Sequence, residues 1–221
     1  MATKTNIDQK LQYVRHVTVF YAYIFIVWGF YRLLIQFPEV IEETIVKPLI
    51  WLVPVYILVK REGADRSLLG LNANRIFPAI YGMLTLGFIF AVAAMVVNYL
   101  KYNGFYFASN VGQGLFVVSL GLSIITAITE EIAFRGYLFG RLQGIVQKEW
   151  LANGITSVGW LFVHFPNALF NWGFNTQELV IYSILVFGFS LAATFMYART
   201  KTIIAPVLLH ILWQWPIILF R

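Results

Sequence analysis

Seven long apolar stretches separated by short connections dominate the sequence. A helix needs about 17–25 mostly apolar residues to cross the hydrocarbon core of a bilayer. The stretches that meet or approach this length are 17–37, 45–59, 76–100, 115–145, 151–165, 179–198 and 203–220. The pattern therefore predicts an all-α fold, a polytopic transmembrane helix bundle.

The fourth stretch, 115–145, is too long for a single span. A continuous helix over it would measure roughly 46 Å at about 1.5 Å per residue. We expect it to break near Gly136 into a span and an interfacial helix, which gives the bundle seven to eight helices. With 221 residues and no long polar segment, the chain is expected to form a single membrane domain over 1–221.

Composition and charge support the same reading. The chain is 60% hydrophobic and 12% charged, against about 45–50% and about 25% in ordinary soluble domains. Its net charge of +6 comes from basic residues scattered in short connections, which predicts membrane orientation rather than nucleic-acid binding. Cysteine is absent, so the chain has no thiolate metal site and no cysteine nucleophile.

The charged connections alternate in sign. Basic residues precede the first stretch, and the next connection is acidic, with Glu39, Glu42 and Glu43 against a single Lys47. The connection after the second stretch is basic again. By the positive-inside bias, we expect a multi-pass protein of the cell membrane with a cytoplasmic amino terminus. The compact chain with short connections is more typical of a prokaryotic protein.

Few strongly polar residues lie within the apolar stretches. They are Arg32, Glu130, Glu131, Arg135, His164, His210 and Gln214. An ionised carboxylate in hydrocarbon costs at least about 2.5–3.5 kcal/mol, so such residues usually face the bundle interior and are functional candidates. Arg32 can extend its charged end to the interface, and we assign it no chemistry.

The adjacent glutamates are expected to have different roles. Glu131 and Arg135 are four residues apart, so they share a helix face and can form an ion pair. Glu130 lies about 140° around the helix from Arg135 and cannot share that face. Glu130 is therefore left for a partner on another helix, which we expect to be His164 on the next span.

The depths of three ionisable residues agree with a shared site. Glu130 lies about 22 Å along its helix from residue 115, His164 about 20 Å from residue 151, and His210 about 10 Å from residue 203. Within a core of about 30 Å, these depths bring the three within roughly 10 Å of one another, in the inner half of the membrane. Gln214 follows His210 by one helical turn and projects from the same face.

Two kinds of chemistry fit such a set of residues. A glutamate and a histidine can activate a water molecule, while a second histidine and an amide stabilise a developing oxyanion. Alternatively, two histidines and a carboxylate can hold Zn²⁺ with an open position for water. The chain contains no HExxH motif, so zinc ligands would have to come from three separate helices.

Three short motifs in this part of the chain resemble those of a known family. "EEIAFR" (130–135) fits an EExxxR motif, "WLFVH" (160–164) fits FxxxH with Trp160 in place of Phe, and "HILWQ" (210–214) ends in an amide four residues after a histidine. In this order and membrane setting, the motifs are similar to those of the CAAX prenyl protease and bacteriocin-processing (CPBP) family of intramembrane endopeptidases. The resemblance covers about 115–221.

The resemblance implies a role for each matching residue. Glu130 and His164 would activate water, and His210 and Gln214 would stabilise the oxyanion, without a metal cofactor. Gln214 replaces the family's Asn or Asp and carries its amide one methylene further from the backbone. Glu131, Arg135 and Trp160 would support the site.

The implied function is hydrolysis of a peptide bond near the cytoplasmic side of the membrane. The implied partners are the lipid bilayer and a peptide or membrane-protein substrate, lipidated substrates included. Two alternatives remain open at this point. One is a non-enzymatic membrane protein of the same fold that acts in binding or immunity, and the other is a Zn²⁺-dependent version of the protease.

Overall fold

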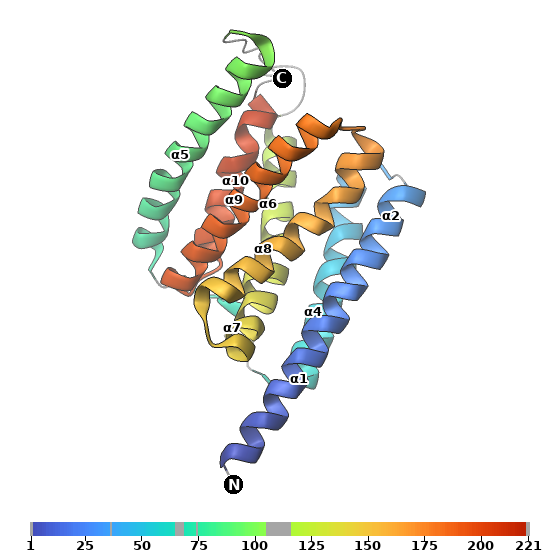
Figure 1. Ribbon diagram of the computed structural model, residues 1–221, viewed down its shortest axis with the longest axis vertical. Coiled ribbons are helices and arrows are strands. Elements are labelled where there is room, and N and C mark those ends of the chain that lie inside the picture. Colours follow the sequence, from blue (N-terminus) through green and yellow to red (C-terminus); the bar gives the residue numbers. More distant parts are fainter. Residues whose placement is uncertain (1, 36, 65–68, 74, 105–115, 220–221) are drawn as a thin grey trace.

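The chain folds into a bundle of helices (Figure 1). The structure, a computed structural model, describes residues 2–35, 37–64, 69–73, 75–104 and 116–219. Within these residues there are seven continuous helices and no strand, which confirms the predicted all-α bundle. Residues 115 and 220, the predicted limits of the fourth and last stretches, lie outside the described residues.

Several of the seven helices change between α and π geometry along their length. In chain order, their bounds are α1 (Ala2–Tyr23), η1 (Ile24–Trp28) and α2 (Gly29–Leu34); α3 (Glu39–Ile41), η2 (Glu42–Val46) and α4 (Lys47–Arg61); α5 (Ile76–Tyr102); α6 (Phe116–Glu131), η4 (Ile132–Phe139) and α7 (Gly140–Val146); α8 (Glu149–Pro166) and η5 (Asn167–Asn171); α9 (Thr176–Thr200); and α10 (Ile204–Leu219). Single π turns inside α-helices occur frequently at functional sites.

Four of the helices in the described part of the chain are long and apolar enough to cross a membrane. They cover Ile7–Leu34, Ile76–Leu100, Val117–Val146 and Thr176–Thr200. Each agrees in position with one of the predicted spans. This pattern marks the chain as a membrane protein.

The predicted break near Gly136 is wrong. The helix runs without interruption from Phe116 to Val146 and passes through the π segment η4 at this point. Gly136 serves a close packing contact instead, because a Cβ atom there would come within 2.8 Å of the carbonyl oxygen of Leu69. The small residue admits a neighbouring backbone and does not end the helix.

The second helix begins earlier than predicted. It starts at Glu39 rather than near residue 45. This start places Glu42, Glu43 and Lys47 on a helix inside the bundle, where each is at most 9% exposed. The sequence had assigned these three charges to a connection.

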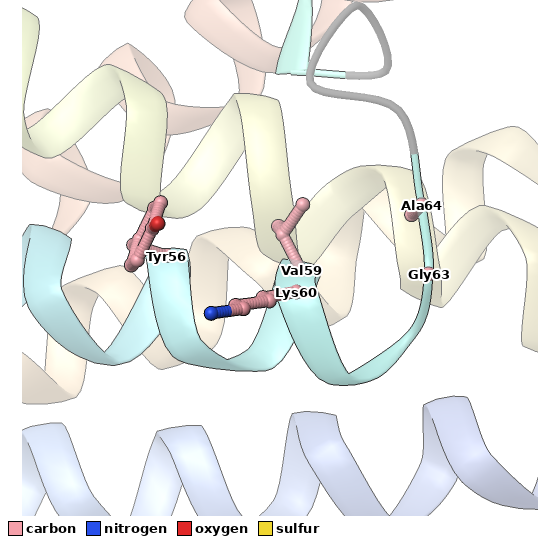
Figure 2. Close-up of a pocket in the computed structure, with 5 residues that line it drawn as sticks. All are labelled: Tyr56, Val59, Lys60, Gly63 and Ala64. Atoms are coloured by element: carbon pink, nitrogen blue, oxygen red, sulfur yellow. The ribbon is translucent and has the colours of Figure 1, made fainter.

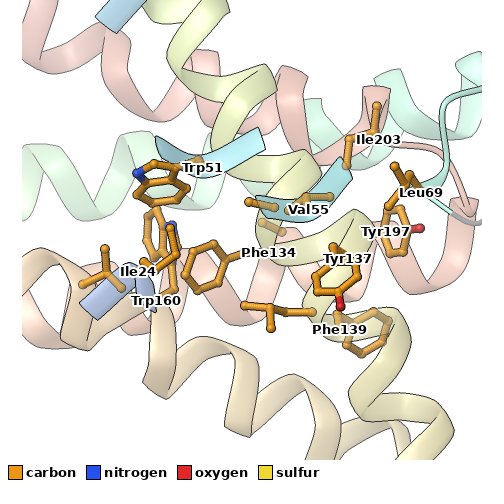
Figure 3. Packing of buried hydrophobic residues seen from close by; sticks show 14 of the residues in the cluster. Ile24, Trp51, Val55, Leu69, Phe134, Tyr137, Phe139, Trp160, Tyr197 and Ile203 are labelled. Atoms are coloured by element: carbon orange, nitrogen blue, oxygen red, sulfur yellow. The ribbon is translucent and has the colours of Figure 1, made fainter. Parts of the chain in front are cut away.

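The helix formed by α6 and η4 lies at the centre of the bundle (Figure 1). α6 contacts η2 and α4 on one side and α10 on another, while η4 contacts α8 and α9. Buried aromatic and aliphatic side chains fill the space around η4, among them Phe134, Trp51 and Trp160 (Figure 3). The end of α6 therefore lies where side chains from several helices can meet.

Candidate active site

Glu130 is buried at the end of α6, with 4% of the residue exposed. Its Oε1 lies 3.0 Å from Nζ of Lys47 on α4. Its Oε2 accepts a hydrogen bond from the indole Nε1 of Trp160 on α8 at 3.2 Å. The same Oε2 lies 4.0 Å from Nε2 of His210 on α10. Side chains from three other helices therefore converge on this carboxylate.

The predicted ion pair between Glu131 and Arg135 is present. Arg135 Nη1 lies 3.0 Å from Glu131 Oε1, and both side chains are fully buried. Arg135 also donates to the Ser190 hydroxyl at 2.8 Å and to Thr194 at 3.3 Å, both on α9. Because every charged hydrogen of a buried guanidinium needs an acceptor, these contacts fix η4, which follows α6, against α9.

Glu131 has a second partner that the spacing did not indicate. Its Oε1 lies 2.7 Å from Nδ1 of His210. A carboxylate only accepts hydrogen bonds, so Nδ1 carries the hydrogen, and Nε2 of the ring faces Glu130. The ring packs against Phe189, with 5.0 Å between the ring centroids. Glu131 thus sets the orientation of His210.

His164 is half-buried one turn after Trp160. Its Nδ1 lies 2.8 Å from the Trp160 carbonyl oxygen, and its ring packs on the indole with 4.2 Å between centroids. The carbonyl only accepts, so Nδ1 is the protonated nitrogen and Nε2 keeps its lone pair in the neutral ring.

The predicted Glu130–His164 pairing takes a looser form. His164 is not among the side chains in ion-pair contact with Glu130 in the part of the chain that the structure describes. Trp160 bridges the two residues, since its indole nitrogen contacts Glu130 and its carbonyl oxygen contacts His164.

Gln214 lies beside His210, as its spacing predicted. The amide nitrogen is 3.4 Å from Nε2 of His210. The amide oxygen accepts a short hydrogen bond from the hydroxyl of Ser123 on α6. Ser123 therefore orients the amide, a contact between distant residues that the sequence did not reveal.

Lys47 is the main residue of the site that sequence reasoning missed. It lies 3.0 Å from Glu130 and 2.5 Å from Glu43, the residue four positions before it. Glu43 also accepts from the Thr126 hydroxyl on α6. The spacing of Glu43 and Lys47 was the available signal, because charges four apart on a helix often pair.

The charged contacts continue from Lys47 toward the end of the first helix. Arg32 pairs with Glu42 and lies 3.6 Å from Glu43, and the Tyr31 hydroxyl donates to Glu42 at 3.3 Å. Arg32 therefore has two carboxylate partners inside the bundle. Hydropathy gave no sign of these two contacts.

The side chains do not form a ligand set for zinc. Among the residues that the structure describes, no three His, Asp or Glu side chains are placed to hold one metal ion. Glu130 is engaged by Lys47 and Trp160, and Nδ1 of His210 is engaged by Glu131.

Two pockets in the described structure lie apart from these residues. One, of about 270 Å³, lies at the end of α4 and is lined by Tyr56, Val59, Lys60, Gly63 and Ala64 (Figure 2). The other, of about 520 Å³, is an apolar groove between α1 and α8. Neither is lined by Glu130, His210 or Gln214.

The fold and the site define the class of protein: a helical membrane protein with a buried cluster of glutamate, histidine and amide side chains. Comparison with known families is more specific. Residues 110–216 match the model of the type II CAAX prenyl endopeptidase Rce1-like family. The matched segment contains all three motifs. No curated protein and no solved structure gives a significant match.

The match confirms the family resemblance drawn from the motifs. A protease family acts on peptide or protein substrates, so the chain is a membrane protein related to peptide hydrolases. The match begins at residue 110, and Lys47, Glu43 and Arg32 therefore lie outside it.

Proposed function

We propose that this chain is an intramembrane endopeptidase in which Glu130 and His164 activate a water molecule to hydrolyse a peptide bond. The observation that carries the proposal is the convergence of α4, α8 and α10 on the buried carboxylate of Glu130. Such a buried, oriented carboxylate next to histidines is suited to general base catalysis.

The hydrolytic step can be written with residues of this chain. Glu130 takes a proton from water, and Nε2 of His164, with its lone pair free, accepts the second hydrogen bond that orients the water. The water oxygen bonds to the carbonyl carbon of the substrate. As the peptide C–N bond breaks, the proton held by Glu130 passes to the leaving nitrogen.

The oxyanion that forms on the carbonyl oxygen needs hydrogen-bond donors. The Gln214 amide and Nε2 of His210 lie 3.4 Å apart and form a pair of groups suited to this role. When His210 is doubly protonated, the carboxylate of Glu131 at its Nδ1 stabilises the positive charge. Ser123 holds the amide of Gln214 in place.

We further propose a cell-membrane location with a cytoplasmic amino terminus, and a site that works near the cytoplasmic side. The substrate is then a peptide or membrane protein that reaches the site from the bilayer, which makes a lipidated peptide the first to test. The mechanism uses no metal.

The variant Glu130→Gln tests this proposal. Purified protein in liposomes is incubated with prenylated peptides that end in the CAAX pattern and with the same peptides unprenylated, and products are identified by mass spectrometry. We expect cleavage by the unaltered chain and none by Glu130→Gln, since the amide cannot accept the proton.

The control for this test is Glu149→Gln. Glu149 pairs with the exposed Arg199, away from the site, so this variant should cleave normally. Cleavage by Glu130→Gln at the normal rate would contradict the glutamate mechanism. A chain that cleaves none of these peptides would favour a non-enzymatic binding role of the same fold.

A further inference from the structure

Lys47 is a buried cation in direct contact with the carboxylate to which we assign the general-base role. It is 4% exposed, and its Nζ lies 3.0 Å from Glu130 Oε1 and 2.5 Å from Glu43 Oε2. Burying an ammonium group is expensive unless it is paired and hydrogen-bonded. The contacts of Lys47 must therefore offset the cost of burying its charge.

The need to neutralise Glu43 does not fully explain why Lys47 also contacts Glu130. Glu43 already accepts from Thr126 and lies near Arg32, and Lys47 follows it at the spacing of an ordinary helix pair. The helix pair would be complete with Lys47 turned toward Glu43 alone. The ammonium instead lies between Glu43 and Glu130 and joins α4 to the end of α6.

The contact between Lys47 and Glu130 determines how the Glu130 carboxylate is oriented. Lys47 holds Oε1, while the Trp160 indole holds Oε2, the oxygen that faces His210. A carboxylate held at both oxygens cannot rotate about its last bond. Oε2 is thereby kept on the side where His210 and the Trp160–His164 turn lie.

We propose that Lys47 is a positioning residue for the hydrolytic reaction, which fixes the Glu130 carboxylate through Oε1 and is itself held by Glu43. The inference rests on the proposed function of Glu130. It also means that the helix 39–61, outside the family match at 110–216, completes the site.

The test must separate positioning from simple charge balance. Among Arg32, Glu42, Glu43, Lys47 and Glu130 there are three carboxylates and two cations. The variant Lys47→Met adds one uncompensated negative charge to this cluster, and we expect it to lose stability for that reason alone. The double variant Lys47→Met/Glu43→Gln removes one charge of each sign and keeps the net charge of the cluster.

We expect the double variant to regain most of the thermal stability lost in Lys47→Met but to keep a low kcat. The expected loss of kcat is on the order of 100-fold, as for small misplacements of a catalytic group, with KM changed by less than about twofold. Lys47→Arg, which keeps the charge, should recover part of the kcat. Lys60→Met on the same helix is the control and should have normal kcat, because Lys60 lines the separate pocket of Figure 2.

The two proposals fail in different ways. If Glu130→Gln cleaves at the normal rate, the glutamate mechanism fails, and the positioning role fails with it. If Glu130→Gln is inactive but Lys47→Met/Glu43→Gln has the kcat of the unaltered chain, only the positioning role fails. A double variant with normal folding, low kcat and unchanged KM supports it.

Discussion

Trp160 makes contacts that a phenylalanine at the same position could not make. Its indole nitrogen donates to Glu130 Oε2 at 3.2 Å. Its ring also lies under the Arg135 guanidinium, 5.0 Å from the centroid, and against His164. The replacement of the family's Phe by Trp in the second motif is therefore more than an exchange of one aromatic ring for another.

The variant Trp160→Phe should separate these contributions. The ring contacts largely remain, but the hydrogen bond to the carboxylate is lost, and such bonds to charged groups contribute about 1.5–3 kcal/mol. We expect kcat to fall at least tenfold with the fold retained, measured by peptide cleavage and thermal unfolding in detergent. Trp172→Phe, at an exposed position, is the control. Normal kcat in Trp160→Phe would show that the indole nitrogen does not matter.

The site residues differ in how far the sequence could reveal them. The Glu131–Arg135 pair was predictable because both partners lie on one helix, four residues apart. The contact of Lys47 with Glu130 was not, since it joins residues 83 positions apart through the packing of two helices. The motifs marked Glu130, His164, His210 and Gln214 as candidates, but only the packing shows which atoms meet.

At the scale of single helices, hydropathy predicts that a segment is helical better than it predicts where the helix begins and ends. Each apolar stretch became a helix, because only internal hydrogen bonding satisfies the backbone in lipid. The second helix nevertheless begins at Glu39, within charges that would normally end a span. Inside the bundle Glu42 pairs with Arg32 of the first helix and Glu43 pairs with Lys47, which hydropathy alone cannot anticipate.

Gly136 offers a direct test of how the central helix packs. An alanine usually stabilises a helix interior by about 0.5–1 kcal/mol relative to glycine. At Gly136 its Cβ would come within 2.8 Å of the Leu69 backbone oxygen, which cannot move aside easily. We therefore expect Gly136→Ala to destabilise the protein by about 1–3 kcal/mol, seen as a lower Tm.

Gly140 on the same helix is the matched control for this prediction. A Cβ atom there meets no atom within 4 Å. Gly140→Ala should therefore leave the Tm unchanged or raise it slightly. Equal effects of the two substitutions would contradict close packing at Gly136.

At the scale of the whole molecule, one group of polar contacts lies at the end of the bundle where the chain begins. Figure 1 shows α1, α4 and α7 together near that end. Glu62 accepts hydrogen bonds there from Tyr137 and Arg141 and lies 2.9 Å from Nδ1 of His16. These contacts join the first, second and fourth helices. The segment 171–177, at the opposite end of the bundle, contains neither Lys nor Arg.

The two ends of the bundle predict how the protein lies in the membrane. Basic residues at the first end, among them Lys148, Arg199 and Lys201, favour the cytoplasmic side. Because the chain has no cysteine, the single variants Lys148→Cys and Gln177→Cys can be labelled without background.

Both positions are exposed. Lys148 directly precedes α8, and Gln177 lies at the start of α9, beyond the other end of the helix formed by α8 and η5. In intact cells, a membrane-impermeant maleimide should label Gln177→Cys at once and Lys148→Cys only after permeabilisation. The reverse pattern would place the amino terminus outside the cytoplasm. Because the depth of Glu130 is fixed relative to both ends, that result would also move the proposed site away from the cytoplasmic half of the membrane.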